Sequence, residues 1–254
     1  MEDMVGKLTI ETHNLTRKFG DFASVSDLNL QVPTGEIFGF LGPNGSGKST
    51  TVKMLTGLLK PTSGKALIGG LSMDTDSVAI KRQIGVLPEN LALFDSLTIW
   101  EHLMMCGPVY GLSRHETETR AEQLLKYLDI FDKRNTYVDQ ASHGMKKKCS
   151  LAMALLHNPK VLFLDEPFEG IDPVSSRNIK DLLILLSGKG VTIFITSHIL
   201  EIVERLVHSF AIIVRGEIVC SQTMEQTVRS GQTLEDVFLR YVDRTIVEEM
   251  QWLG

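Results

Sequence analysis

Residues 42 to 49 read GPNGSGKS and match G-x-x-x-x-G-K-[ST], the pattern of a loop that binds phosphate groups. Glycines let the backbone turn sharply, so that its N–H groups can point at phosphate oxygens. Lys48 can reach the β- and γ-phosphates of a nucleotide, and the Ser49 hydroxyl can ligate Mg²⁺. A flexible glycine-rich loop is the alternative, and the Lys-Ser pair argues against it. The residues expected to bind the nucleotide here are Gly42, Pro43, Asn44, Gly45, Ser46, Gly47, Lys48, Ser49 and Thr50.

A second place for chemistry is the end of the apolar run VLFLDEP, residues 161 to 167. Asp165 follows four apolar residues, and a carboxylate at such a strand end can hold Mg²⁺ through water. We expect the next residue, Glu166, to face the attacking water of a hydrolysis reaction. The protein's part in phosphoryl transfer is mostly positioning and charge stabilisation, which suits a carboxylate that orients water. A surface acid, or a carboxylate that only supports its neighbours, is the alternative for Glu166.

The stretch ASHGMKKKCSLAMALLHNPKVLFLDEP, residues 141 to 167, places a Ser-x-Gly turn and a helix directly before this acidic strand. The order resembles the signature segment of the ATP-binding cassette (ABC) family, whose commonest form is LSGGQ. Ser142, Gly144 and Met145 align with its Ser, second Gly and Gln. FEGID after Glu166 resembles the D-loop of that family, and ITSH resembles the segment that ends in its switch histidine. The resemblance covers nearly the whole chain, to the tail TLEDVFLRYV.

The resemblance implies ATP as the nucleotide and assigns further residues. Asp172 would be the D-loop aspartate, and His198 the switch histidine that acts with Glu166 and Lys48 in catalysis. Ser142 and Gly144 would bind the γ-phosphate of an ATP molecule held by a second subunit, since a helix N-terminus binds anions well. A single cassette would then be half of a dimer. The alternative, that Ser142 merely caps its own helix, is compatible with that role.

The signature departs from the common form at two positions. Ala141 stands where Leu is usual and His143 where the first Gly is usual. The form S-x-G-M-[KR] is familiar in a branch of bacterial exporters whose membrane subunit is a separate chain. We expect His143 to be a solvent-exposed residue, with a donor to the phosphate as the alternative. The run from Lys146 to Lys148 is expected to form a solvated helix face that adds positive potential near the phosphates.

Two more site residues follow from the resemblance. Phe19 aligns with the aromatic residue that stacks on adenine, and an aromatic residue packed at a strand end is the alternative. Glu89 stands where most members have Gln, and its carboxylate would add negative charge beside Mg²⁺ and the γ-phosphate. The metal ligands implied are Ser49, Glu89 and Asp165.

The elements that position these residues belong to a mixed α/β chain. Residues 8–19 and 23–32 alternate apolar and polar side chains, as half-buried antiparallel strands do. Residues 36–42 form a nearly continuous apolar run, typical of a buried central strand. Helical periodicity replaces the strand pattern from about residue 95 to residue 157. The strand pattern returns at residues 161–167, 191–197 and 210–220.

The helix after residue 171 has a clear predicted start, because Asp172 can cap it and Pro173 suits its first position. The fold class expected from the resemblance is a P-loop NTPase core of ABC ATPase type, with an antiparallel β-subdomain and an inserted helical subdomain. The chain would be one domain over residues 1–254. Its core would cover about residues 1–89 and 158–222, its helical subdomain about 90–157, and a C-terminal helical tail about 223–254.

The composition is that of an ordinary globular protein, with 43% hydrophobic and 22% charged residues. A net charge of −5 lacks the basic character of a nucleic-acid binder, so no nucleic-acid partner is expected. The three cysteines form no CxxC pair, which suits a reducing cytosol. The N-terminus lacks the apolar core of a signal peptide, and no apolar run reaches the ~18 residues of a membrane span. We therefore expect a cytoplasmic protein, peripheral on the cytoplasmic face of the cell membrane.

The resemblance implies an ATP-hydrolysing subunit that energises export through a separate transmembrane permease subunit. Its second partner would be another ABC ATPase subunit, in a homodimer or a homologous heterodimer. One alternative is a soluble single-cassette ATPase in an assembly process that does not transport. Another is a nucleotide-gated binding module without turnover, and the presence of Lys48, Asp165, Glu166 and His198 argues against it.

In this family a short helix of the transmembrane subunit docks between the core and the helical subdomain. The residues after Glu89 form one wall of that groove, and here they include many large apolar side chains. We expect Leu93 and Phe94 to face the permease, because apolar anchors in a groove suit helix docking. Leu103 and Met104 are expected to pack inside the helical subdomain.

Overall fold

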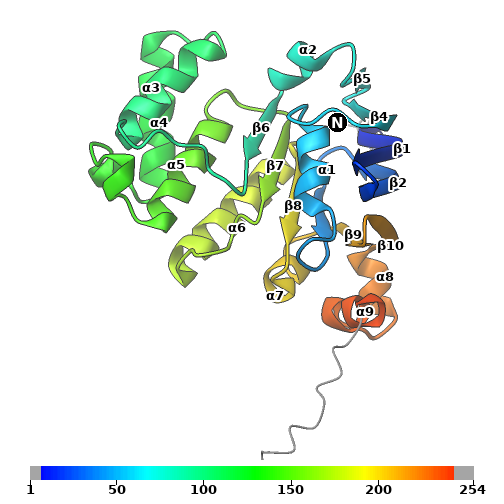
Figure 1. The fold of residues 1–254 in the computed structure, drawn as a ribbon. Helices are drawn as coiled ribbons and strands as arrows, with labels where there is room; N and C mark the ends of the chain where they lie inside the picture. The colour runs from blue at the N-terminus through cyan, green and yellow to red at the C-terminus, as the bar shows by residue number, and fades with distance from the viewer. Residues whose placement is uncertain (1–6, 243–254) are drawn as a thin grey trace, which may run out of the picture.

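The structure is a computed structural model that describes residues 7–242, and it contains two sheets with helices around them (Figure 1). Figure 1 shows helices α3, α4 and α5 together on one side of the central sheet and strands β1, β2 and β4 on the other. The last residues of the predicted helical tail, 243–254, lie outside the described residues.

The smaller sheet is antiparallel and has the strand order β2-β1-β4-β5. Its long hairpin confirms the two strands predicted from alternating apolar and polar residues. The side chains on one face are buried, and those on the other face are largely exposed. The strands are β1 (Leu8–Phe19), β2 (Phe22–Pro33), β4 (Ser63–Ile68) and β5 (Leu71–Ser72).

The larger sheet has the order β10-β9-β3-β8-β7-β6, in which β10 pairs antiparallel with β9 and the other pairs are parallel. Three of its strands, β3, β7 and β8, are buried along their full length, as their continuous apolar sequences predict. The strands are β3 (Ile37–Leu41), β6 (Ile84–Leu87), β7 (Val161–Asp165), β8 (Thr192–Ser197), β9 (Ser209–Val214) and β10 (Glu217–Thr223).

The register of these parallel strands decides where their last residues meet. Leu41 at the end of β3 pairs with Ser197 at the end of β8, and Asp165 at the end of β7 pairs with Thr196. The carboxyl ends of β3, β7 and β8 therefore lie at one edge of the sheet. The phosphate loop, Glu166 and His198 each follow one of these ends, so the sheet brings them together.

The predicted helical region contains three α-helices, α3 (Ile99–Val109), α4 (Arg114–Tyr127) and α5 (His143–Leu155), and two short 3₁₀ helices, Phe131–Lys133 and Val138–Gln140. The first two begin with capping boxes, in which Thr98 and Ser113 each exchange hydrogen bonds with a glutamate three residues later. The remaining helices are α1 (Lys48–Leu55), α2 (Ser77–Lys81), α6 (Pro173–Gly188), α7 (Leu200–Glu204), α8 (Met224–Arg229) and α9 (Leu234–Tyr241). None of the helices within residues 7–242 is long and apolar enough to cross a membrane.

Two hydrophobic clusters share the central sheet. One contains residues of α3, α4, α5 and α6, and the other joins α1 and the antiparallel sheet to the same central strands. Phe194 of β8 anchors the second cluster, where its ring lies 5.3 to 5.7 Å from those of Phe38, Phe40 and Phe163. The helix that follows the phosphate loop and the helix that carries the signature therefore pack in different clusters.

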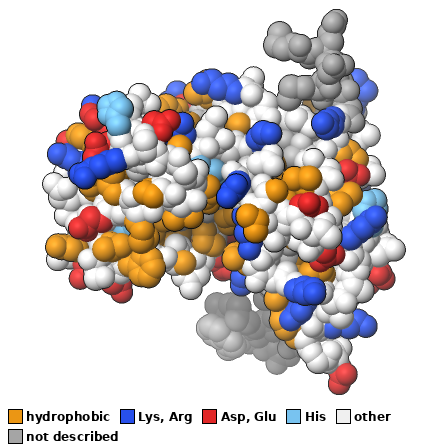
Figure 2. Space-filling model, turned by 90° about the horizontal axis from the view of Figure 1, so that it is seen from above, with side chains coloured by type: hydrophobic (Ala, Val, Ile, Leu, Met, Phe, Trp, Pro, Cys, Tyr) orange, Lys and Arg blue, Asp and Glu red, His pale blue; other side chains and the backbone are white. Residues whose placement is uncertain are grey.

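Figure 2 looks at the molecule from above and shows hydrophobic side chains gathered over the side where α3 to α5 lie and toward a hollowed centre. Three exposed apolar residues lie on α3 or in the segment that leads into it: Phe94 exposes 57% of its surface, Met105 44% and Val109 76%. An exposed apolar patch of this kind marks a candidate interaction surface.

Candidate functional site

The phosphate loop is wrapped around the ammonium group of Lys48. The Lys48 Nζ donates hydrogen bonds to the carbonyl oxygens of Gly42 (2.8 Å) and Pro43 (3.3 Å), and the side chain is buried. With the carbonyls turned inward to the lysine, the loop can present N–H groups outward. This is the arrangement that binds the phosphates of a nucleotide.

Two positions of the loop have no room for a side chain. A Cβ atom on Gly42 would lie 2.3 Å from the Ile213 carbonyl oxygen, and one on Gly47 would lie 2.6 Å from the Ser24 carbonyl oxygen. Gly47 also has φ 111°, a conformation that glycine adopts readily and other residues rarely adopt. The Ser46 Oγ is buried and has no hydrogen-bond partner among the described residues.

A cavity of about 520 Å³ lies over the loop, a size that suits a nucleotide-sized ligand. It brings the phosphate loop together with two sequence-predicted residues from other strands, Glu166 and His198, and with Glu89. Its lining consists of Phe22, Ser24, Asn44, Gly45, Gly47, Lys48, Ser49, Thr50, Glu89, Glu166, Glu169 and His198.

The three predicted metal ligands lie close to one another beside this cavity. The Ser49 hydroxyl donates to Glu89 Oε2 over 3.1 Å, and Asp165 Oδ1 accepts a hydrogen bond from the Thr196 hydroxyl. Burial raises the pKa of Asp165, while hydrogen bonds from Thr196 and Ser49 act to lower it. One hydroxyl and two carboxylates fit Mg²⁺ that is shared with substrate phosphates. Within residues 7–242 no group of three His, Cys, Asp or Glu side chains forms a metal cage made by the protein alone.

Glu166 is held from two sides. Its Oε2 lies 3.0 Å from His198 Nδ1 and accepts the backbone N–H of the same histidine over 3.3 Å. Its Oε1 lies 3.8 Å from Lys48 Nζ, and only 6% of the residue is exposed. The backbone of Glu166 has φ 50°, which is uncommon for a residue with a side chain. The carboxylate thus lies between the phosphate loop and the end of β8.

The signature residues lie apart from this cavity. Ser142 is the N-cap of α5, where its Oγ accepts the Met145 N–H over 3.2 Å, and its side chain is exposed. Gly144 lies in the same first turn and does not line the cavity. The two residues therefore stand at an open helix N-terminus and do not contact the phosphate loop of their own chain.

Asp172 caps α6, as predicted, and accepts the N–H groups of Val174 (3.1 Å) and Ser175 (3.0 Å). Hydrogen bonds from the Ser175 hydroxyl and backbone N–H hold the pKa of Asp172 below its ordinary value. The carboxylate is exposed beside the turn that follows Glu166.

The aromatic ring at the cavity belongs to Phe22 and not to the predicted Phe19. The two residues pair across the β1–β2 turn, and Phe22 lines the cavity. The Phe19 ring is 48% exposed and has the Arg17 guanidinium 4.5 Å from its centroid. A stacking role for Phe19 stays a prediction, and Phe22 is a second aromatic candidate that the sequence reading missed.

The predicted solvated lysine face was wrong for two of its three residues. Lys147 is 3% exposed and Lys148 8%, while Lys146 is half-buried. The reason is that α5 is buried on nearly all sides from Lys147 onward, so that a lysine at this point must find acceptors inside the protein. The apolar sequence CSLAMALL directly after the lysines was the signal for this burial.

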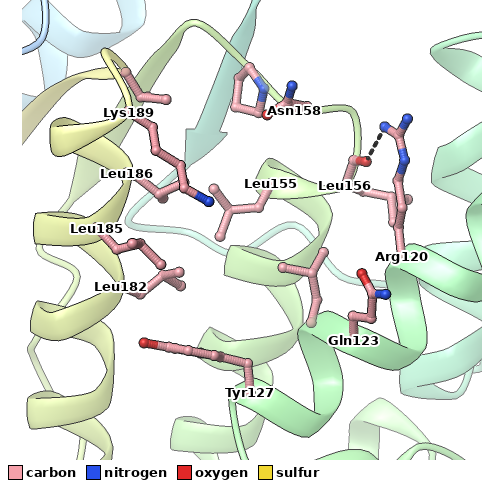
Figure 3. A pocket seen from close by; sticks show the side chains of 13 residues that line it. Arg120, Gln123, Tyr127, Leu155, Leu156, Asn158, Leu182, Leu185, Leu186 and Lys189 are labelled. Atoms are coloured by element: carbon pink, nitrogen blue, oxygen red, sulfur yellow. Dashed lines mark hydrogen bonds between the residues drawn. The ribbon is translucent and has the colours of Figure 1, made fainter.

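A separate cleft of about 490 Å³ lies between α4, the end of α5 and α6 (Figure 3). Figure 3 shows Leu182 and Leu185 of α6 facing Tyr127 of α4 across it, while the Arg120 Nη1 donates to the Leu156 carbonyl over 3.1 Å. Leucine side chains dominate the lining, and it contains neither the phosphate loop nor the carboxylates of the site. This cleft therefore does not suit a triphosphate.

Residues 25–169 match the model of a protein family described as ABC transporter. Linearmycin resistance ATP-binding protein LnrL of Bacillus subtilis (strain 168) is 36% identical over 214 residues, which cover 84% of this chain and 69% of LnrL. Probable multidrug ABC transporter ATP-binding protein YbhF of Escherichia coli (strain K12) is 34% identical over 249 residues, which cover 95% of this chain and 43% of YbhF. The chain thus spans less than half the length of YbhF.

Two solved structures share the fold. An ATP binding subunit of an ABC transporter superposes with a TM-score of 0.85 and 30% identity, over 91% of this chain and 98% of that one. The dimeric ATP-binding cassette MJ0796, in a post-hydrolysis state bound to ADP and Pi, gives a TM-score of 0.79 and 25% identity, over 85% of this chain and 98% of that one. These similarities confirm the predicted α/β cassette fold.

Gly47→Ala is expected to weaken nucleotide binding, because the new Cβ would lie 2.6 Å from the Ser24 carbonyl at a φ of 111°. A backbone strain of about 1–3 kcal/mol corresponds to a loss of roughly fivefold to 10²-fold in affinity. Titration with a fluorescent ATP analogue measures the change. Gly188→Ala is the control, since a Cβ at Gly188 meets nothing within 4 Å. Equal affinities in the two variants would contradict the assigned loop geometry.

Proposed function

This chain is an ATP-binding cassette of the ABC transporter family, an ATPase domain, and from that premise we propose that it energises export through a separate transmembrane permease subunit. The observation that carries the ATP-hydrolysing part of this proposal is the position of Glu166, whose carboxylate lies 3.0 Å from His198 Nδ1 and 3.8 Å from Lys48 Nζ at the cavity. A carboxylate at that place can accept a proton from an attacking water. The relative LnrL is named for linearmycin resistance, which supports export as the direction of transport.

The residues of the cavity divide the work of hydrolysis. The N–H groups of the phosphate loop and the Lys48 ammonium bind the β- and γ-phosphates. Ser49, Glu89 and Asp165 would hold Mg²⁺, which would supply positive charge against the phosphate oxygens. Glu166 orients the attacking water and takes its proton, while His198 keeps the Glu166 carboxylate turned toward the loop.

The signature residues serve a second subunit. Ser142 and Gly144 stand at the exposed N-terminus of α5, whose first N–H groups can bind the γ-phosphate of an ATP molecule on a partner cassette. The partner is either another copy of this chain or a homologous cassette. The dimeric state of the similar cassette MJ0796 supports this arrangement.

The permease docks beside a cavity of about 410 Å³ that is lined by Ala92 and by residues of the core strand β6 and of α3. Phe94 is 57% exposed, and its ring lies 6.1 Å from that of His102. The buried His102 fixes this loop, since its Nε2 accepts the Phe94 N–H over 2.9 Å. Leu93 is half-buried against the core. A rigid loop that presents an aromatic anchor suits helix docking.

The proposal includes the division of the chain into parts. The core covers about residues 1–89 and 158–222, the helical subdomain about 90–157, and the helical tail about 223–254. In this arrangement the core binds ATP and the helical subdomain carries the signature. The cassette works at the cytoplasmic face of the cell membrane, where the permease and ATP are both available.

Glu166→Gln should retain ATP binding but lose steady-state turnover by roughly 10²-fold or more, the scale of a general-base loss. The amide keeps the shape of the side chain and cannot accept the proton from water. Phosphate release measures turnover, and size exclusion should show accumulated ATP-bound dimers. Unchanged turnover would remove Glu166 from the role of base.

A mixture of Ser142→Arg chains with Lys48→Ala chains should recover part of the activity that each variant loses alone. Some heterodimers in the mixture pair one intact phosphate loop with one intact signature. ATPase activity of the mixture is compared with that of each variant at the same total concentration. Activity no greater than that of the separate variants would count against a site shared between two chains.

Phe94→Asp should abolish co-purification with the co-expressed permease, because it places a charge where an apolar anchor is buried on docking. ATP hydrolysis by the isolated cassette should stay near normal. Val228→Asp on α8 is the control for the added surface charge, because Val228 is likewise an exposed apolar residue (68%). Co-purification and transport that survive Phe94→Asp would mean that the permease docks elsewhere.

A further inference from the structure

Lys147 is a buried charged residue that the mechanism above does not use. It lies on α5, one turn after the signature residues, and it exposes 3% of its surface. Its Nζ donates hydrogen bonds to the carbonyl oxygens of Glu166 (2.5 Å) and Glu169 (2.7 Å). Both acceptors belong to the turn that follows β7 and carries the proposed catalytic base.

The Glu166 N–H donates to the carbonyl oxygen (3.2 Å) and the hydroxyl (3.1 Å) of Thr196 on β8, but hydrogen bonding within the turn itself is weak. The Glu169 N–H reaches the Glu166 carbonyl oxygen over 3.4 Å, which is long for a hydrogen bond. Glu166 has a φ of 50°, and such a conformation persists only where the surroundings impose it. The shorter, charge-assisted bonds from Lys147 are the strong contacts that hold these two carbonyls.

Four acidic side chains near Lys147 favour its positive charge. Burial lowers the pKa of Lys147, while Glu169, Glu166, Asp165 and Glu89 act to raise it. The ammonium group therefore lies in a cluster of acids but donates to backbone carbonyls. The Glu166 carboxylate itself contacts His198 and Lys48.

A second contact joins the same two elements. Gly170 in the turn has φ 67°, and a Cβ there would lie 2.7 Å from His143 Cδ2 at the start of α5. The first turns of α5 and the turn after β7 thus pack as one unit, with His143 over Gly170 and Lys147 on the two carbonyls.

We propose that Lys147 is a positioning residue, which holds the backbone of Glu166 so that its carboxylate faces the phosphate loop. This inference rests on the proposed function, in which Glu166 accepts the proton of the attacking water. Lys147 also ties that base to the helix that begins at Ser142. A shift of α5 at its N-terminus is therefore transmitted to the geometry of hydrolysis at the chain's own nucleotide.

Lys147→Met tests the proposal, because methionine retains the apolar stem and loses the three N–H donors. The kcat for ATP should fall by about tenfold or more, since small misplacements of a catalytic group cost up to about 10²-fold. The KM for ATP should stay within about twofold, because the phosphate loop is untouched. Lys147→Arg, which retains donors and charge, should recover most of the lost kcat. Lys180→Met on α6 is the matched control for the loss of a lysine charge, because Lys180 is half-exposed and lies outside the nucleotide cavity.

A double-variant cycle separates positioning from general damage. If Lys147 acts through Glu166, then Lys147→Met should add no further loss of turnover to Glu166→Gln. If the two variants reduce turnover independently, so that their fold-losses multiply in the double variant, the proposal is overturned. A normal kcat in Lys147→Met also overturns it. Should Lys147→Met fail to fold, Lys147→Gln is measured in the same cycle, with the same two overturning results. A wild-type chain without ATP turnover would instead contradict the proposed function itself.

Discussion

Four charged side chains are buried at one edge of the central sheet, and the rest of the site depends on how their charges are compensated. Lys48, Lys147, Asp165 and Glu166 each expose 6% of their surface or less. A buried charge is costly unless it is paired or hydrogen-bonded. The two lysines donate to backbone carbonyls, Asp165 accepts from Thr196, and Glu166 lies against a lysine and a histidine. These partners meet only when β3, β7 and β8 pair in their observed register.

The same strand register also determines the geometry of the nucleotide site. The phosphate loop follows β3, the acidic pair ends β7, and His198 follows β8, so one parallel sheet positions three segments that are far apart in sequence. The buried cluster around Phe194 holds these strands from one side, and the helices α5 and α6 cover the other. A change in either layer acts on the cavity through the strand ends.

Much of this could be predicted from the sequence because the signals are local. The phosphate loop is identified by a motif between a buried strand and a helix. Lys48, Glu166 and His198 meet at one cavity because the carboxyl ends of parallel strands lie at the same edge of a sheet. The failures depend on contacts across the chain. The lysine run predicts a surface position for Lys147, but its hydrogen-bond acceptors lie about twenty residues later, on another element, and no local pattern indicates them. The alternation of β1 cannot tell which phenylalanine of the hairpin faces the cavity, and Phe22 does.

The exposed position of Ser142 has a genetic consequence. Ser142 is exposed at the start of the signature helix α5 and belongs to neither hydrophobic cluster, so a substitution there leaves both clusters packed. In the proposed dimer, a chain altered at Ser142 keeps its own phosphate loop and still pairs with a second cassette. In a cell that makes both forms, such a chain withdraws normal subunits into defective pairs. Mutations at Ser142 should therefore behave as dominant, whereas mutations that unfold the shared central sheet should be recessive.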